Sequence, residues 1–157
     1  MDARLSIFGN STADKLVKHL VGAGMAIAPA LPYTTLELVN LRCSQINGCG
    51  FCTDMHIKDA IHAGESQQRL NMVSVWREAT CFTEAERAAL ELAEEGTRIA
   101  DAAGGVSDEV WANAAKHYDE QQLFALTAQI ALINTFNRLN VITRQPAGDY
   151  VAGQFSH

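Results

Sequence analysis

The sequence has no long apolar run and no sign of an export signal. No stretch of its 157 residues approaches the roughly 20 consecutive apolar residues that a membrane-spanning helix needs. The first residues, MDARLSIFGNSTADK, have neither an apolar segment after a basic start nor a small-residue cleavage site. The sequence therefore predicts a soluble, cytoplasmic protein without a membrane partner.

Basic side chains are also scarce. Twelve Lys and Arg residues stand against 18 Asp and Glu residues, which gives a formal net charge of -6 and a pI of about 5.3. The basic residues are scattered, so no stripe is available to neutralise the phosphates of a nucleic acid, and we expect no such partner. Hydrophobic residues make up 48% of the chain, which is typical of a globular protein with a hydrophobic core.

Proline is rare, and apolar residues recur at spacings of three and four, which indicates an all-α fold. We expect a single compact domain over residues 1–157 with about seven helices. The expected helices cover about residues 13–23, 32–46, 49–63 and 66–79, followed by helices that begin at Thr83 and Ser107 and a long one over about 120–142. Thr83 with Glu86, and Asp119 with Gln122, have the spacing of a capping box.

The long last helix is apolar on more than one face, so we expect it to lie centrally or at a subunit interface. Its polar segment NTFNRLN, residues 134–140, is expected to lie at an interface or to line a substrate channel, and we favour the interface. Cys43 and Cys81 are predicted to be inert thiols, buried or half-buried. The aromatic residues expected in the core are Trp76, Trp111 and the Phe residues, and the histidines expected at the surface are His19, His62, His117 and His157.

The stretch SQINGCGFCTDMH, residues 44–56, contains two cysteines and a histidine within eight positions. On an α-helix, where each residue advances the direction by about 100°, Cys49, Cys52 and His56 share one narrow face. Phe51 points to the other side and is expected to pack against the core. Asn47 is the expected N-cap, which puts Cys49 in the first turn and Cys52 just beyond it. The helix dipole favours a thiolate at Cys49, and His56 favours one at Cys52, so either sulfur could be activated.

Glu37 is the expected partner of His56. If residues 32–46 and 49–63 form an antiparallel hairpin, Glu37 stands level with His56 across it. Glu37 also shares one side of its helix with Asn40 and Ser44, so a polar strip faces the cysteines and the histidine.

These residues suit thiol chemistry. A carboxylate orients a histidine, the histidine removes a proton from one cysteine, and the second cysteine resolves the oxidised sulfur as a disulfide. The alternatives are structural burial of both thiols and a zinc site in which Cys49, Cys52 and His56 are joined by Glu37. A second Cys/His pair, which such zinc sites usually use, does not occur in the sequence.

Glu37, QINGCGFCTDMH (residues 45–56) and NRLNV (residues 137–141) resemble the alkylhydroperoxidase D core, within the carboxymuconolactone decarboxylase-like superfamily. The resemblance covers residues from about 30 to about 145. Its most specific part is a glutamate twelve positions before a CxxC pair that is followed, after three intervening residues, by a histidine. Members of the superfamily that act on lactones lack the CxxC pair, so that activity is not expected.

The resemblance implies an all-α subunit that forms trimers or hexamers and acts as a peroxidase. It implies that Cys52 is the peroxidatic cysteine, that Cys49 is the resolving partner and proton donor, and that His56 with Glu37 is the proton relay. It implies no bound cofactor or metal but an external dithiol reductant, such as a thiol protein or a lipoyl-bearing protein. Phe51 replaces a histidine of alkylhydroperoxidase D, which leaves the reductant open.

Two hypotheses follow from the CxxC pair. The first is a thiol peroxidase that reduces hydrogen peroxide or organic hydroperoxides. The second is a non-catalytic oligomer that uses the same cysteines to sense redox state or to bind a metal. Both predict a reversible Cys49–Cys52 disulfide, and turnover of peroxide separates them.

Overall fold

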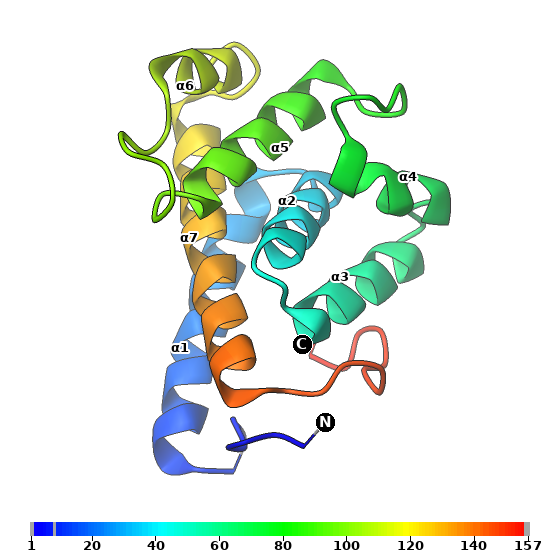
Figure 1. Ribbon diagram of the computed structural model, residues 1–157, viewed down its shortest axis with the longest axis vertical. Coiled ribbons are helices and arrows are strands. Elements are labelled where there is room, and N and C mark those ends of the chain that lie inside the picture. Colours follow the sequence, from blue (N-terminus) through cyan, green and yellow to red (C-terminus); the bar gives the residue numbers. More distant parts are fainter. Residues whose placement is uncertain (1, 8, 156–157) are drawn as a thin grey trace.

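Seven α-helices and two short 3-10 helices follow one another in the computed structural model, which describes residues 2–7 and 9–155 (Figure 1). In order they are α1 (Ser11–Ile27), η1 (Ala28–Ala30), α2 (Tyr33–Ile46), α3 (Gly50–His62), α4 (Gln67–Met72), η2 (Val73–Val75), α5 (Glu84–Thr97), α6 (Asp108–Ala114) and α7 (Glu120–Thr143). These residues contain no strand, so the predicted all-α fold is confirmed.

The helix starts follow local capping signals. Both predicted capping boxes are present, with Glu86 closing the one at the start of α5 and Gln122 the one at the start of α7. α1 begins earlier than expected because the side chain of Asn10 accepts a hydrogen bond from the N–H of Ala13 at 2.8 Å. Short-range chemistry therefore sets where these helices begin.

The predicted fourth helix, over residues 66–79, is wrong in its second half. α4 ends before Val73, and the chain continues as η2 and a series of turns. Leu70, Val73, Trp76 and Ala79 are all buried, at intervals of three residues. A 3-10 helix keeps residues three apart on one side, whereas an α-helix would rotate them progressively away. The 3-10 helix and the turns that follow it keep the whole series in one core.

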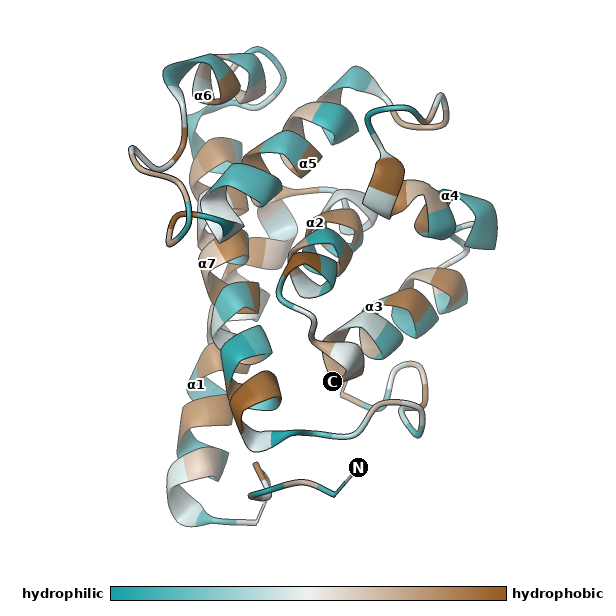
Figure 2. Ribbon diagram, viewed as in Figure 1, coloured by the Kyte–Doolittle hydropathy of each residue, from teal (hydrophilic) through white to brown (hydrophobic). Residues whose placement is uncertain are grey.

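α2 lies at the centre of the molecule, in contact with α3, α5 and α7 (Figure 1). One core cluster joins α2 to α5, α6 and α7 and includes Val39 and Leu126. A second joins α2 to α3, α4 and α5 and includes Leu41 and Leu90. α2 is therefore apolar on two sides, and Figure 2 shows hydrophilic residues alternating with hydrophobic ones along it. The hydrophilic residues on its remaining side form part of the site.

The prediction that the aromatic residues lie in the core holds for Trp76 but not for all of them. The exposed ones are Trp111, Phe124 and Phe155, with 45%, 76% and 39% of their surface accessible. Trp111 lies on the short helix α6, which buries only Val110 and Ala114. Phe124 projects from the outer side of α7, because the inner side is occupied by the buried residues around it. Phe8 lies outside the described residues.

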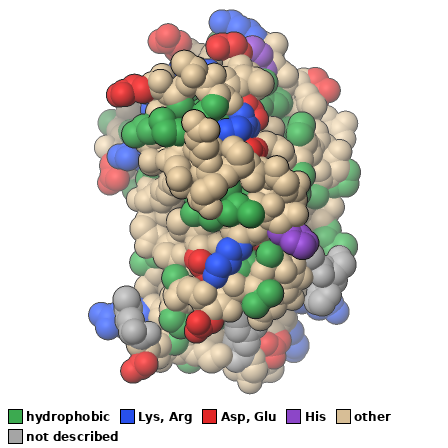
Figure 3. Space-filling view, turned by 90° about the vertical axis from the view of Figure 1, so that its right-hand side faces the viewer, with side chains coloured by type: hydrophobic (Ala, Val, Ile, Leu, Met, Phe, Trp, Pro, Cys, Tyr) green, Lys and Arg blue, Asp and Glu red, His purple; other side chains and the backbone are tan. Residues whose placement is uncertain are grey.

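The surface carries three of the four histidines expected there. His19, His62 and His117 are exposed as predicted, whereas His157 lies outside the described residues. No helix within residues 2–7 and 9–155 is long and apolar enough to cross a membrane. On the face that carries α3, α4 and the C-terminal segment, acidic and basic side chains are interspersed, without a continuous basic patch on its described surface (Figure 3).

Candidate functional site

The turn between α2 and α3 is formed by Asn47, Gly48 and Cys49. Gly48 has a φ of 65°, in the left-handed region that glycine adopts without strain. The sequence predicted Asn47 as the N-cap of α3. In the structure it is instead the C-cap of α2. Its Nδ2 donates hydrogen bonds to Oδ1 of Asn134 and Oδ1 of Asn137, both at 2.9 Å. This side chain is used to hold the turn against α7, so it is not free to cap α3.

Cys49 takes the N-cap position of α3 instead. Its Sγ accepts a hydrogen bond from the N–H of Cys52 at 3.2 Å. Cys52 is the third residue of α3 and lies within the first turn, whereas the sequence placed it just beyond that turn. Both sulfurs therefore lie at the positive end of the helix dipole, which favours the thiolate form of each cysteine.

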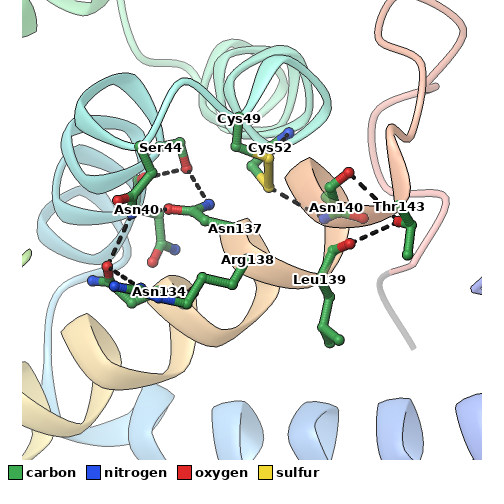
Figure 4. Close-up of a disulfide and its surroundings, with 11 residues drawn as sticks. Asn40, Ser44, Cys49, Cys52, Asn134, Asn137, Arg138, Leu139, Asn140 and Thr143 are labelled. Atoms are coloured by element: carbon green, nitrogen blue, oxygen red, sulfur yellow. Dashed lines mark hydrogen bonds between the residues drawn. A yellow bond between two sulfur atoms is a disulfide. The ribbon is translucent and has the colours of Figure 1, made fainter.

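Cys49 and Cys52 are joined by a disulfide, with their Cα atoms 5.4 Å apart. Each residue is only 1% exposed. Across the interface with α7, Nδ2 of Asn140 donates a hydrogen bond to Sγ of Cys52 at 3.3 Å (Figure 4). The disulfide is therefore enclosed by protein. Sγ of Cys49 accepts a hydrogen bond from the N–H of Cys52, and Sγ of Cys52 accepts one from Asn140.

The contact expected between Glu37 and His56 is present. Nδ1 of His56 lies 2.9 Å from Oε2 of Glu37, and each residue is 7% exposed. Nδ2 of Asn40 donates a hydrogen bond to Oε1 of Glu37 at 3.3 Å. A carboxylate on Nδ1 fixes the proton there and leaves Nε2 of His56 as the atom that can exchange a proton with a ligand.

A small cavity adjoins Glu37 between α2 and α3. Its volume is about 20 Å³, and its lining also includes Tyr33 and Glu65. This is room for about one water molecule. Burial, together with the nearby charge of Glu37, raises the pKa of Tyr33, so Tyr33 stays protonated beside the carboxylate.

Uncharged polar side chains connect α2 to α7 behind the disulfide. We call this set the amide seam; it consists of Asn40, Ser44, Asn47, Gln129, Asn134, Asn137 and Asn140. Gln129 donates to Oδ1 of Asn40 at 2.6 Å, and Asn137 donates to Oγ of Ser44 at 3.0 Å. Figure 4 shows the part of the seam nearest the sulfurs. The seam joins Glu37, through Asn40, to the helix that contacts Cys52.

Three asparagines of the segment NTFNRLN belong to the amide seam. Asn134, Asn137 and Asn140 are buried and form their hydrogen bonds within the subunit, to the α2–α3 turn, to Thr97 and to Cys52. The sequence offered an interface or a substrate channel for this segment but no contact with Cys52, and the interface stays a prediction. A signal was available, because three asparagines three residues apart make a polar stripe along one side of an otherwise apolar helix.

The two remaining cysteines lie apart from the disulfide. Cys43 is buried as predicted, and its Sγ accepts a hydrogen bond from Oγ1 of Thr97 at 3.1 Å. Burial raises the pKa of the Cys43 thiol to about 11, so it stays protonated at neutral pH. Cys81 is half-buried. Within residues 2–7 and 9–155, no group of three or more His, Cys, Asp and Glu side chains is arranged to hold a metal ion.

The C-terminal segment, residues 145–155, packs alongside α3 (Figure 1). Nζ of Lys58 donates hydrogen bonds to the carbonyl oxygens of Gly148 and Tyr150, at 2.8 and 2.9 Å. The hydroxyl of Tyr150 donates to the carboxylate of Asp59 at 2.9 Å. Phe51 packs edge-to-face on Tyr150, with ring centres 6.4 Å apart, and not against the core as predicted. This segment helps to enclose the start of α3.

Comparison with known proteins places this site in a family. Residues 12–95 match the carboxymuconolactone decarboxylase family. The uncharacterised protein YdfG of Bacillus subtilis (strain 168) is 43% identical over 108 residues, which are 69% of this chain and 72% of YdfG.

Solved structures of similar proteins are consistent with this family. A protein of unknown function from Agrobacterium tumefaciens, described as a candidate antioxidant defence protein AhpD, is 32% identical. It superposes with a TM-score of 0.86 over 95% of this chain and 100% of its own. The debrominase Bmp8 is 20% identical, with a TM-score of 0.77 over 88% of this chain and 74% of its own, and so shares the fold. The chain is thus an AhpD-like member of the carboxymuconolactone decarboxylase family.

Proposed function

We propose that this protein is a thiol-dependent peroxidase that reduces hydrogen peroxide or organic hydroperoxides through the Cys49–Cys52 pair. The observation that supports this most is the arrangement of two cysteines at a helix start with a Glu37–His56 pair one turn further along. Cys52 is the attacking sulfur, Cys49 resolves the product, and His56 with Glu37 relays protons. The likeness to a candidate antioxidant defence protein AhpD supports a peroxidase function.

Each step of the proposed cycle balances. His56 takes the proton of the Cys52 thiol, and the thiolate attacks the terminal oxygen of the hydroperoxide. An S–O bond forms, the O–O bond breaks, and the alkoxide or hydroxide that leaves takes the proton back from His56. The Cys49 thiol then attacks Sγ of the Cys52 sulfenic acid, giving the disulfide and water. An external dithiol reduces the disulfide and is itself oxidised.

The partners of this cycle are a thiol protein or a lipoyl-bearing protein as reductant, in the reducing cytoplasm where such dithiols are maintained. The proposed assembly is a homotrimer or hexamer. An apolar groove of about 520 Å³ between α5, α6 and α7, lined by the exposed side chains of Ile99 and Trp111, supports self-association on that side.

The test of this proposal is turnover. Consumption of hydrogen peroxide and of tert-butyl hydroperoxide is measured with dihydrolipoamide as reductant, for the wild type, Cys52→Ser and Cys49→Ser. Wild type should turn over and Cys52→Ser should not, whereas Cys49→Ser, assayed without reductant, should consume about one equivalent of peroxide per subunit. A wild type that forms the disulfide but consumes no more peroxide than Cys52→Ser would exclude the peroxidase.

That outcome would favour the second hypothesis, a non-catalytic oligomer that senses redox state or binds a metal. Two further measurements complete the comparison. Zinc content of the purified reduced protein tests metal binding directly. Incubation of the reduced protein with 2,3,4-tribromopyrrole, the compound in complex with a cysteine-to-alanine variant of Bmp8, tests whether the dithiol releases bromide instead.

A further inference from the structure

Two buried side-chain atoms, one on α3 and one on α7, have no hydrogen-bond partner among the described residues. They are Nε2 of His56 and Oδ1 of Asn140, and this part of the chain has no others. Buried polar atoms in folded proteins are almost always paired, so each of these two needs an explanation. They come from different helices: Asn140 of α7 donates a hydrogen bond to Cys52, and His56 lies one turn after Cys52 on α3.

Asn140 differs from the two asparagines that precede it on the same side of α7. Oδ1 of Asn134 and Oδ1 of Asn137 both accept hydrogen bonds from Asn47. The Asn140 side chain is 5% exposed, and within the described chain its one hydrogen-bond partner is Sγ of Cys52. The asparagine that contacts the sulfur is therefore the one whose acceptor is unused.

The two unused atoms complement a hydroperoxide. The terminal –OH of a hydroperoxide has one hydrogen to donate, and an amide oxygen can only accept. The other peroxide oxygen needs a proton when it leaves. With Nδ1 of His56 held by Glu37, the atom of His56 that can deliver this proton is Nε2.

We infer that Asn140 is a further catalytic residue, and that its Oδ1 and Nε2 of His56 form the subsite that binds the –O–O–H group beside Cys52. The inference rests on the proposed peroxidase function. The Asn140 N–H stabilises the Cys52 thiolate through a charge-assisted hydrogen bond. Its Oδ1 accepts the hydrogen of the terminal oxygen, which the thiolate attacks, and the same oxygen stays bound there as the sulfenic acid forms. The electron pair of the broken O–O bond goes to the other oxygen, which takes the proton from Nε2 of His56.

The first experiment tests the contact with the sulfur and needs no peroxide. In reduced Cys49→Ser protein, the rate at which iodoacetamide alkylates Cys52 is measured against pH by peptide mapping. Asn140→Leu, which has the shape of Asn but no hydrogen bonds, should move the midpoint of this profile upward by about one pH unit. Asn137→Leu is the matched control, since Asn137 lies one turn earlier, is fully buried and donates to Ser44 rather than to sulfur. Equal midpoints in the two variants would overturn the thiolate role.

The second experiment tests the subsite. Oxidation of Cys52 by one equivalent of tert-butyl hydroperoxide is followed at a pH above every midpoint, where thiolate formation no longer limits the rate. Asn140→Leu should react about tenfold more slowly than Asn137→Leu, because the acceptor for the terminal –OH is gone. Equal rates at that pH would overturn the subsite.

A third variant covers the case in which Asn140→Leu does not fold. Asn140→Asp keeps the shape and the acceptor, loses the donor and adds a negative charge, so it should raise the alkylation midpoint by more than one unit. An unchanged midpoint in Asn140→Asp would contradict the inference. If the Cys49→Ser parent reacts with no peroxide at all, the proposed function fails, while the alkylation profiles still decide whether Asn140 acts on Cys52.

Discussion

Two polar regions of this molecule, each built around buried side chains, differ in how completely their buried atoms are paired. The first is the Glu94 cluster, which consists of Glu94, Arg42, Trp76 and Arg77. Glu94 accepts hydrogen bonds from Nε of Arg42 at 2.7 Å, from Nε1 of Trp76 at 2.9 Å and from Arg77. The guanidinium of Arg77 also lies over the Trp76 ring, 4.3 Å from its centre. Every group of this cluster is charged or aromatic, and both carboxylate oxygens of Glu94 are bonded.

The second region is the amide seam, whose members are uncharged. Its last member, Asn140, contacts Cys52 and has an unused acceptor, and the neighbouring His56 has an unused ring nitrogen. Leaving a buried polar atom unpaired costs about 1–3 kcal/mol. A cluster that only stabilises the fold has no reason to do this. The comparison indicates that the Glu94 cluster holds α2, α5 and the segment after η2 together, while the seam serves the sulfurs.

The strongest test of this contrast is Glu94→Gln. The charge of Arg42 would remain partly buried without its counter-charge, so the free energy of unfolding should fall by about 3 kcal/mol. Urea unfolding measures this, and the rate of peroxide reduction per folded molecule should not change. Glu78→Gln, an exposed glutamate near the same cluster, is the control and should alter stability by less than about 0.5 kcal/mol. A large loss of peroxide reduction in folded Glu94→Gln would erase the distinction between the two regions.

Glu37→Gln should have the opposite effect, a large loss of peroxide reduction with little loss of stability. Gln can still accept a hydrogen bond from Asn40, but it cannot hold a protonated His56, so peroxide reduction should fall about 100-fold. The free energy of unfolding should change by about 1 kcal/mol or less, well below the effect of Glu94→Gln. Steady-state kinetics and urea unfolding on the same preparation decide the matter. Full activity with reduced stability would assign Glu37 to the structural region.

Cys43 offers a test at alkaline pH. Burial raises the pKa of its thiol from 9.0 to about 11, so the folded protein retains this proton after the unfolded chain has lost it. The stabilisation is complete below pH 9 and is lost as pH rises toward 11, by an amount on the order of 2 kcal/mol. Urea unfolding from pH 8 to 11 should show this decline in the wild type, and a flatter profile in Cys43→Ala. Parallel profiles would mean that another group controls alkaline stability.

The smallest expected effect is at acid pH. Burial alone would raise the pKa of Glu94, but hydrogen bonds from Arg77, Trp76 and Arg42 outweigh it and lower the pKa below its usual value. The stabilisation from this group is present above the pKa of an unfolded glutamate, near 4.5, and is lost as pH falls through the lower folded value. Wild type should therefore lose more stability between pH 5 and 3 than Glu94→Gln does. The same slope in both proteins would mean that Glu94 is not the group that titrates.

The parts of the fold that the sequence predicts well depend on neighbours along the chain. The capping boxes of α5 and α7 use residues three apart, so their positions can be recognised directly. Glu37 and His56 meet because two helices joined by a short turn must lie side by side. The helix predicted over residues 66–79 is wrong beyond Met72, where a 3-10 helix and then turns bring Val73, Trp76 and Ala79 into a common core.

What the sequence missed in the site depends on distant contacts. Asn47 has the residue type of an N-cap, but two asparagines of α7, 87 and 90 residues away, use its amide, and Cys49 caps α3 instead. Asn140 contacts Cys52 across 88 residues. No local pattern connects these pairs, although the regular spacing of the asparagines on α7 marks the stripe to which they belong.

The burial of Cys43 has a practical consequence. A side chain with no exposed surface and a protonated sulfur cannot be modified by a thiol reagent until the surrounding core opens. The rate at which Cys43 is labelled therefore measures how often the core opens. The native sequence thus contains a thiol probe of its own unfolding.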